Sequence, residues 1–142
     1  MKSLFKNICI ASDHAGFRIK EHIKSFLIKN KISIIDLGPE TSISVDYPDF
    51  AKKVSRRLKS KKSSAGILVC GSGTGMAISA NKFKGIRAAV CYNFASTRLS
   101  RLHNNANIIS LGARLTNKNY AFKMISTFLN TKFEGGRHLK RV

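Results

Sequence analysis

The feature that most constrains the fold is a regular alternation of short apolar segments with longer amphipathic ones. The apolar, β-rich segments are 7–12, 32–38, 65–70, 85–92 and 107–112. Segments with apolar residues near helical spacing follow them at 16–30, 47–60, 75–83, 95–105 and 119–130. This alternation predicts a parallel sheet with crossover helices on both faces. We therefore predict an α/β fold: a single doubly wound, Rossmann-like, three-layer domain over residues 1–142, with a five-stranded parallel sheet and a C-terminal tail.

The predicted strands also indicate where a ligand binds. They are apolar along nearly their whole length, which predicts that each strand is buried on both faces. Ligands of such sheets bind beyond the carboxyl ends of the strands. The segments there carry polar and reactive residues: "SDHAG", "SVDYP", "CGSGTG", "CYN" and "GARLT". We expect a binding site at this edge.

The net charge raises the question of nucleic-acid binding. The chain has 26 Lys and Arg against 7 Asp and Glu, a formal net charge of +19, which attracts polyanions. No nucleic-acid-binding module is recognisable, and we expect no specific nucleic-acid partner. The basic residues are instead spread over helical positions expected to face solvent, among them Lys20, Lys24, Lys29, Lys52, Lys53, Lys82 and Lys123.

The cysteines and the apolar runs bear on location. Cys9, Cys70 and Cys91 are an odd number without metal-ligand spacing, which favours free thiols in a reducing cytoplasm. No apolar stretch approaches the ~20 residues that span a bilayer, so no membrane association is expected. The N-terminal apolar run is interrupted by Lys6 and Asn7, which indicates a first strand rather than a signal peptide.

The glycine loop "CGSGTG" at 70–75 follows the third predicted strand. It lacks the third glycine of a dinucleotide fingerprint, because Met76 stands there, and it lacks the Gly-Lys-Ser/Thr ending of a P-loop. What it offers is a run of backbone N–H groups at a helix N-terminus, which can bind a phosphate or an oxyanion.

Cys70 lies beside this loop, and two interpretations fit it. Amide dipoles and a helix N-terminus stabilise a thiolate, which could act as a nucleophile or as a base that removes a proton next to a carbonyl. In the second case the loop amides would stabilise an enediolate oxygen. Alternatively, Cys70 is a small buried residue at the end of a core strand. Cys9 and Cys91 take that structural interpretation, because both fall in predicted apolar strands.

Five blocks of sequence resemble the type B ribose-5-phosphate isomerase family. In order along the chain from residue 8 to 142, they are "SDHAGF", "DYPDFA", "CGSGTGMAISANKFKGIRAA", "LSRLHNNANIISLGAR" and "FEGGRHLKRV". The resemblance implies interconversion of ribose 5-phosphate and ribulose 5-phosphate through a cis-enediolate, in the pentose phosphate pathway, without a metal or organic cofactor. It also implies a homodimer whose subunits share each active site, and it leaves open whether dimers pair into tetramers.

The resemblance further implies roles for individual residues. Cys70 is the base that moves a proton between C2 and C1, and His103 assists opening of the furanose ring. Arginines bind the phosphate, and the loop amides face the enediolate. The implied substrate-binding residues are Asp13, His14, Gly71, Ser72, Gly73, Thr74, Gly75, Asn104, Arg114, Arg137 and Arg141, with Asp46 and His138 as further neighbours of the substrate.

Physical chemistry supports some of these roles. Arg137 and Arg141 are four residues apart, so on an α-helical turn they would face one phosphate together. His103 carries an imidazole, a group that can give or take a proton during ring opening. Each of these residues also has a purely structural interpretation. The C-terminal arginines could belong to a disordered basic tail, and His103 could be an ordinary surface histidine. Asp13 and Asp46 could be helix caps.

Two other functions share much of this sequence pattern. A protein that only binds a phosphosugar would need no base at position 70. Related subunits isomerise galactose 6-phosphate, but Cys70, His103 and the three arginines favour ribose 5-phosphate. Allose 6-phosphate remains open as a side substrate.

Overall fold

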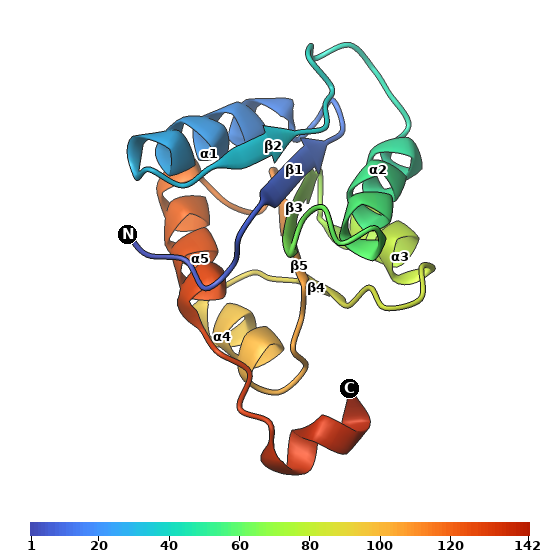
Figure 1. The fold of residues 1–142 in the computed structure, drawn as a ribbon. Helices are drawn as coiled ribbons and strands as arrows, with labels where there is room; N and C mark the ends of the chain where they lie inside the picture. Colours follow the sequence, from blue (N-terminus) through green and yellow to red (C-terminus); the bar gives the residue numbers. More distant parts are fainter.

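The computed structural model describes residues 1–142 and contains one parallel sheet of five strands in the order β2-β1-β3-β5-β4, with helices on both faces (Figure 1). The strands are β1 (Ile8–Ser12), β2 (Ile34–Asp36), β3 (Ala65–Cys70), β4 (Ala88–Val90) and β5 (Ile108–Gly112). The helices are α1 (Phe17–Lys29), α2 (Tyr47–Lys59), α3 (Thr74–Asn81), α4 (Phe94–Leu102), α5 (Lys118–Asn130) and the 3-10 helix η1 (Gly136–Arg141). The predicted doubly wound sheet is confirmed.

Two apolar clusters, one on each face of the sheet, form the core. One joins β1, β3 and β5 to α1 and α5, through residues such as Ile23 and Phe128. The other joins the same strands to α2 and α3, through residues such as Val54 and Met76. Because the three central strands are covered on both faces, all of their residues are buried, as their continuous apolar sequence predicts.

The prediction of two-sided burial is wrong for β2 and β4. Each has only three residues, and each lies at an edge of the sheet. All three residues of β4 are half-buried. In β2, Ile34 is half-buried, and Ile35 and Asp36 are exposed. An edge strand has a neighbour on one side only, so fewer of its residues are covered.

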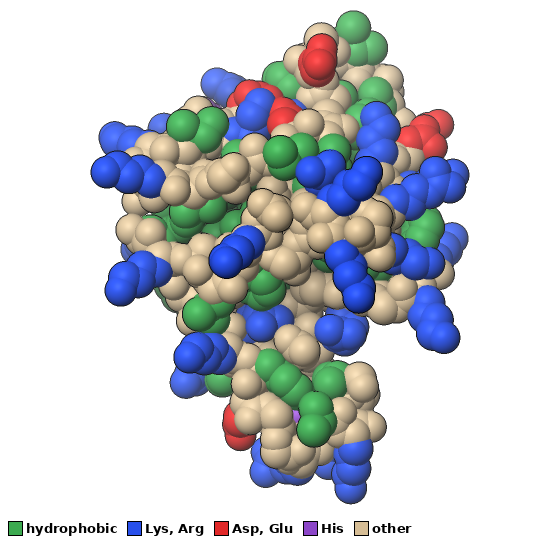
Figure 2. All heavy atoms as spheres, in the orientation of Figure 1, with side chains coloured by type: hydrophobic (Ala, Val, Ile, Leu, Met, Phe, Trp, Pro, Cys, Tyr) green, Lys and Arg blue, Asp and Glu red, His purple; other side chains and the backbone are tan.

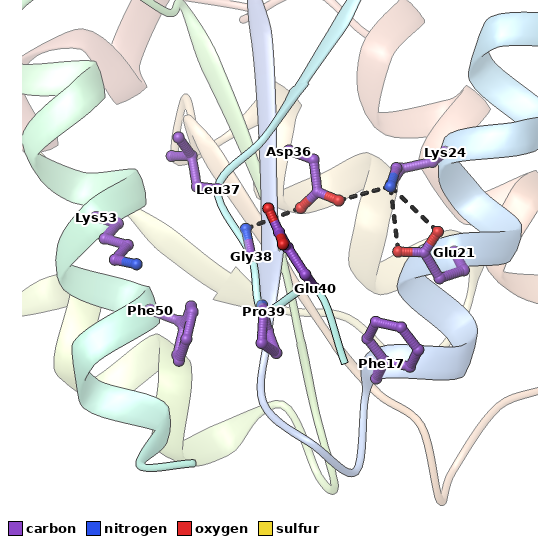
Figure 3. Close-up of a pocket in the computed structure, with 10 residues that line it drawn as sticks. All are labelled: Phe17, Glu21, Lys24, Asp36, Leu37, Gly38, Pro39, Glu40, Phe50 and Lys53. Atoms are coloured by element: carbon purple, nitrogen blue, oxygen red, sulfur yellow. Dashed lines mark hydrogen bonds and ion pairs between the residues drawn. The ribbon is translucent and has the colours of Figure 1, made fainter. Parts of the chain in front are cut away.

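The prediction that Lys20 faces solvent is also wrong. Its side chain is fully buried, and Nζ donates hydrogen bonds to both carboxylate oxygens of Asp36 at 2.9 Å and to Pro39 O at 2.7 Å. Asp36 also accepts a hydrogen bond from Lys24, which in turn pairs with Glu21 (Figure 3). A buried ammonium group requires such partners.

We expect Asp36→Asn to lower the free energy of unfolding by about 3 kcal/mol near neutral pH, because it removes the main counter-charge of a buried lysine. Burial alone would raise the pKa of Asp36, but hydrogen bonds from Lys24, Lys20 and the Gly38 N–H lower it. The stabilisation is therefore present above the ordinary pKa of about 3.8 and is lost as the pH falls through the lower folded-state pKa.

Urea unfolding of both proteins from pH 7 down to pH 3 measures this effect. The difference between wild type and variant should shrink below about pH 4. Asp49→Asn, a change of the same type at an exposed position, is the control. A difference that stays constant over this range would contradict the assignment.

Lys and Arg side chains are dispersed over the face seen in Figure 2, separated by uncharged atoms, whereas most of the visible Asp and Glu lie near its upper end. This dispersion agrees with the expectation for most of the helical lysines. None of the helices has both the length and the apolar character that crossing a membrane requires.

Candidate active site

A pocket of about 440 Å³ lies at the carboxyl edge of the sheet, where the site is predicted. It receives residues from the ends of β1, β3 and β5 and from the start of α2. Its lining is Asp13, Tyr47, Cys70, Gly71, Ser72, Gly75, Arg114 and Leu115. The structure thus brings together six of the predicted site residues. A larger hollow of about 730 Å³ beside β2 is lined by none of them (Figure 3).

Cys70 ends β3 at the floor of this pocket, with 4% of its surface exposed. The Gly73 N–H donates a hydrogen bond to its Sγ at 3.1 Å. Gly73 can aim its N–H this way because it has a φ of 83°, a left-handed conformation that favours glycine. Ser110 holds the turn by donating to Gly73 O at 2.6 Å. A negative charge on Sγ would therefore meet an amide dipole and the N-terminus of α3, which begins at Thr74.

The other two cysteines have different surroundings. Burial raises the pKa of Cys9 to about 11, and burial also raises the pKa of Cys91. Both thiols are therefore neutral at physiological pH. Cys91 packs in the core cluster beside α1 and α5, and Cys9 packs in the cluster beside α2 and α3. This environment agrees with the structural interpretation of Cys9 and Cys91.

Arg114 lies directly against the glycine loop. A Cβ atom placed on Gly71 would be 2.9 Å from Arg114 Nη1, so a larger residue there would push the guanidinium out of its present position. The Arg114 N–H also donates to Gly71 O at 3.0 Å. A cation is thus held beside Cys70, where it can bind a phosphate or another anion.

The acidic and imidazole residues of this edge are placed as follows. Asp13 is buried and accepts a hydrogen bond from the Gly16 N–H at 2.9 Å, so it stabilises the turn into α1 while it lines the pocket. His14 is exposed, and its Nδ1 accepts from the Val45 N–H at 3.2 Å. Asp46 is at the N-cap position of α2, as its alternative interpretation predicts, but its side chain makes no capping hydrogen bond.

Tyr47 is a site residue that sequence reasoning missed. It lines the pocket with Cys70, and 41% of its surface is exposed. The sequence pattern presented it only as the first residue of a helix. Its position in "SVDYP", one of the segments beyond the strand ends, was the available signal. Its phenol group can donate a hydrogen bond to a bound ligand.

The remaining predicted residues lie at the opposite end of the sheet. Helix α4 returns from the carboxyl end of β4 to the start of β5, so His103, which follows its last residue, lies at the amino edge. The tail that carries Arg137 projects at the same end, away from the 37–46 loop (Figure 1). Asn104 and Arg141 line a separate pocket there, of about 320 Å³, together with Arg87.

The expected pairing of Arg137 and Arg141 is wrong in geometry. Residues 136–141 form a 3-10 helix, not an α-helical turn. With three residues per turn, side chains four apart point about 120° away from each other. Both arginines are exposed, whereas His138 between them is buried and stacks on His103 with ring centroids 4.2 Å apart.

Arg101 anchors this second group of residues. Its buried guanidinium donates to Thr131 O at 3.1 Å, to Asn105 Oδ1 at 3.0 Å and to Ala106 O. It also lies over the rings of Phe5 and Phe128. Arg101 therefore fixes the base of the tail against the loop that follows His103. No sequence signal indicated this contact.

The family model described as Ribose/Galactose Isomerase matches residues 8–142. The chain belongs to the ribose/galactose isomerase family. Within this family, it is 39% identical to ribose-5-phosphate isomerase B of Escherichia coli over 137 residues, which cover 96% of this chain and 92% of that protein.

Solved structures of family members agree with the fold. The ribose-5-phosphate isomerase B of Clostridium thermocellum superposes with a TM-score of 0.94 at 47% identity, covering 96% of this chain and 92% of that one. The Mycoplasma genitalium ribose-5-phosphate isomerase B, solved with bound ribulose-5-phosphate, gives a TM-score of 0.89 at 40% identity, covering 95% and 90%. The predicted family resemblance is confirmed.

Proposed function

We propose that this chain is an aldose–ketose isomerase that interconverts ribose 5-phosphate and ribulose 5-phosphate. The observation that carries the proposal is Cys70 Sγ, held by the Gly73 N–H beside Arg114 in a pocket, in a chain whose structural relative binds ribulose-5-phosphate. The domain would be residues 1–142. Its three free thiols support a location in the cytoplasm.

The proton transfer follows from this geometry. The Cys70 thiolate removes the proton from C2 of the open-chain aldose, the C–H electrons form the C1=C2 double bond, and the carbonyl electrons move to O1. Backbone N–H groups of the 71–75 loop stabilise this oxyanion. A proton passes from O2 to O1, Cys70 returns its proton to C1, and the C2 carbonyl of the ketose forms.

The complete site requires a second copy of the chain. Cys70 and Arg114 lie at the carboxyl edge, whereas His103, Asn104 and Arg141 lie at the amino edge. The length of the strands separates the two groups, so the two groups of one chain cannot both contact the same sugar phosphate. We therefore include in the proposal a homodimer in which the carboxyl edge of each subunit faces the amino edge of the other.

The direct test is an assay of the purified chain with ribose 5-phosphate in the presence of EDTA. Turnover that survives the chelator supports a metal-independent isomerase. Allose 6-phosphate and galactose 6-phosphate, assayed at the same concentrations, test the substrate class. Faster turnover of either hexose phosphate would overturn the assignment of ribose 5-phosphate.

We expect His103→Asn to separate ring opening from proton transfer. Turnover of ribose 5-phosphate, which is mainly cyclic, should fall about 100-fold, because a general acid–base group is lost. Exchange of the C1 protons of open-chain ribulose 5-phosphate with solvent deuterium needs no ring opening and should change only a few-fold. Nuclear magnetic resonance measures the exchange. An equal loss in both reactions would argue against a ring-opening role, and His22→Asn in α1 serves as the control.

A further inference from the structure

The side chains of His103, Glu134 and His138 form a cluster outside the pocket that holds Cys70. One potential ligand atom from each residue lies within 4.8 Å of those of the other two. The three residues come from the end of α4, the segment after α5, and η1. The Glu134 N–H donates to Leu102 O at 3.0 Å, which fixes its backbone against the end of α4. The fold thus gathers two imidazoles and a carboxylate from separate segments.

His138 is the fixed member of this cluster. Only 5% of its surface is exposed, and its Nε2 is buried without any hydrogen-bond partner. Such an orphaned polar atom is uncommon in folded proteins and calls for a specific explanation. The Nε2 atom of His138 therefore has no partner within the chain.

The donor set selects a chemical class of ligand. Two imidazoles and one carboxylate form a common set for Zn²⁺ and similar transition-metal ions. Mg²⁺ and Ca²⁺ prefer oxygen ligands throughout.

The geometry is close to that of a bound ion. Two ligand atoms of a tetrahedral zinc site, each about 2.1 Å from the metal, are about 3.4 Å apart. His103 Nε2 and Glu134 Oε2 are 3.9 Å apart. These two side chains are 35% and 54% exposed, so both can move closer. The His103 ring, now nearly parallel to that of His138, has to turn so that both nitrogens point toward the ion.

We infer that His103, Glu134 and His138 bind a divalent transition-metal ion of the Zn²⁺ class, and that the bound ion inhibits the enzyme. The inhibition rests on the proposed function, because the metal would occupy the imidazole nitrogen with which His103 moves a proton. The nearby cationic side chains of Arg137 and Arg141 repel a divalent cation. The ion is therefore a reversible inhibitor that a chelator removes.

Binding is tested with the metal alone, so that the result does not depend on activity. The full chain, freed of metal with EDTA and dialysed, is titrated with ZnCl₂ in a calorimeter. One Zn²⁺ should bind per chain. Glu134→Gln and His138→Gln should each weaken Zn²⁺ binding at least about tenfold. Removal of a residue that only hydrogen-bonds to a metal ligand already weakens metal binding by about that factor, and these two residues bind the metal directly.

Three controls make the titration specific. Glu40→Gln and His22→Gln change residues of the same types outside the cluster and should bind Zn²⁺ as wild type does. Cys70→Ala should also retain the site, which excludes the Cys70 thiolate as the ligand. If Glu134→Gln binds Zn²⁺ as tightly as wild type, or if Cys70→Ala abolishes binding, the inferred site is wrong.

The second arm measures isomerase activity against ZnCl₂ concentration, with each variant normalised to its own metal-free rate. Wild type should lose activity as the site fills and regain it with EDTA, and Glu134→Gln should need at least about tenfold more Zn²⁺. Full activity at saturating Zn²⁺ would overturn the inhibition. A chain that binds Zn²⁺ through Glu134 but never isomerises ribose 5-phosphate would keep the metal site and refute the proposed function.

Discussion

Cys70→Ala should lower the turnover of ribose 5-phosphate by about 1,000-fold or more, because it removes the group that takes the proton from C2 in the proposed mechanism. It should abolish solvent exchange at C1 of ribulose 5-phosphate as well, unlike His103→Asn. The dissociation constant for the sugar phosphate should change little, since Arg114 and the loop amides remain. Turnover, deuterium exchange and calorimetric binding measure the three effects.

Cys91→Ala is the matched control for this variant. Cys91 is equally buried, but burial raises its pKa and it faces the core beside Ser100. Its removal should cost some stability and leave turnover within a few-fold of wild type. If Cys70→Ala retained near-normal turnover while Cys91→Ala did not, Cys70 would be structural and the mechanism wrong.

Mixing two inactive variants should restore about a quarter of the wild-type activity, if each site is shared between two subunits. The variants are Cys70→Ala and the double change Arg137→Ala with Arg141→Ala. The double variant should lose at least about 100-fold in kcat/KM, because two charge-assisted contacts with phosphate disappear. Half of the mixed dimers are heterodimers, and each heterodimer contains one site with every wild-type residue.

The structure also supplies a pairing that should not restore activity. Cys70 and Arg114 lie in the same pocket of one chain, so a heterodimer of Cys70→Ala and Arg114→Ala chains has no wild-type site. Subunits are exchanged by mild denaturation and refolding, and activity is compared at low substrate concentration. Recovery in this second mixture, or none in the first, would contradict the shared site.

The sequence pattern predicted most of the fold and the group of site residues around Cys70, whereas His103 and the residues near it were named only through the family resemblance. Continuous apolar runs located β1, β3 and β5, because a strand covered on both faces buries nearly all of its side chains and so favours apolar residues. The glycine loop located Cys70, because the residues of a tight turn lie beside each other in sequence and in space. Edge strands were predicted too long, since their sequence does not show that a neighbouring strand is missing.

By itself, then, the sequence determined the order of strands and helices, the edge that carries Cys70, and the membership of a family. The tertiary structure alone decided that Lys20 is buried against Asp36, that Tyr47 enters the pocket, and that Arg101 anchors the tail through Thr131. It also decided that His103 lies at the far edge of the sheet from Cys70. The physical reason is that the local pattern of apolar and polar residues indicates only whether a side chain is exposed to solvent or buried in the core. The partner of a charged side chain is instead set by packing between segments that are 16 or 30 residues apart.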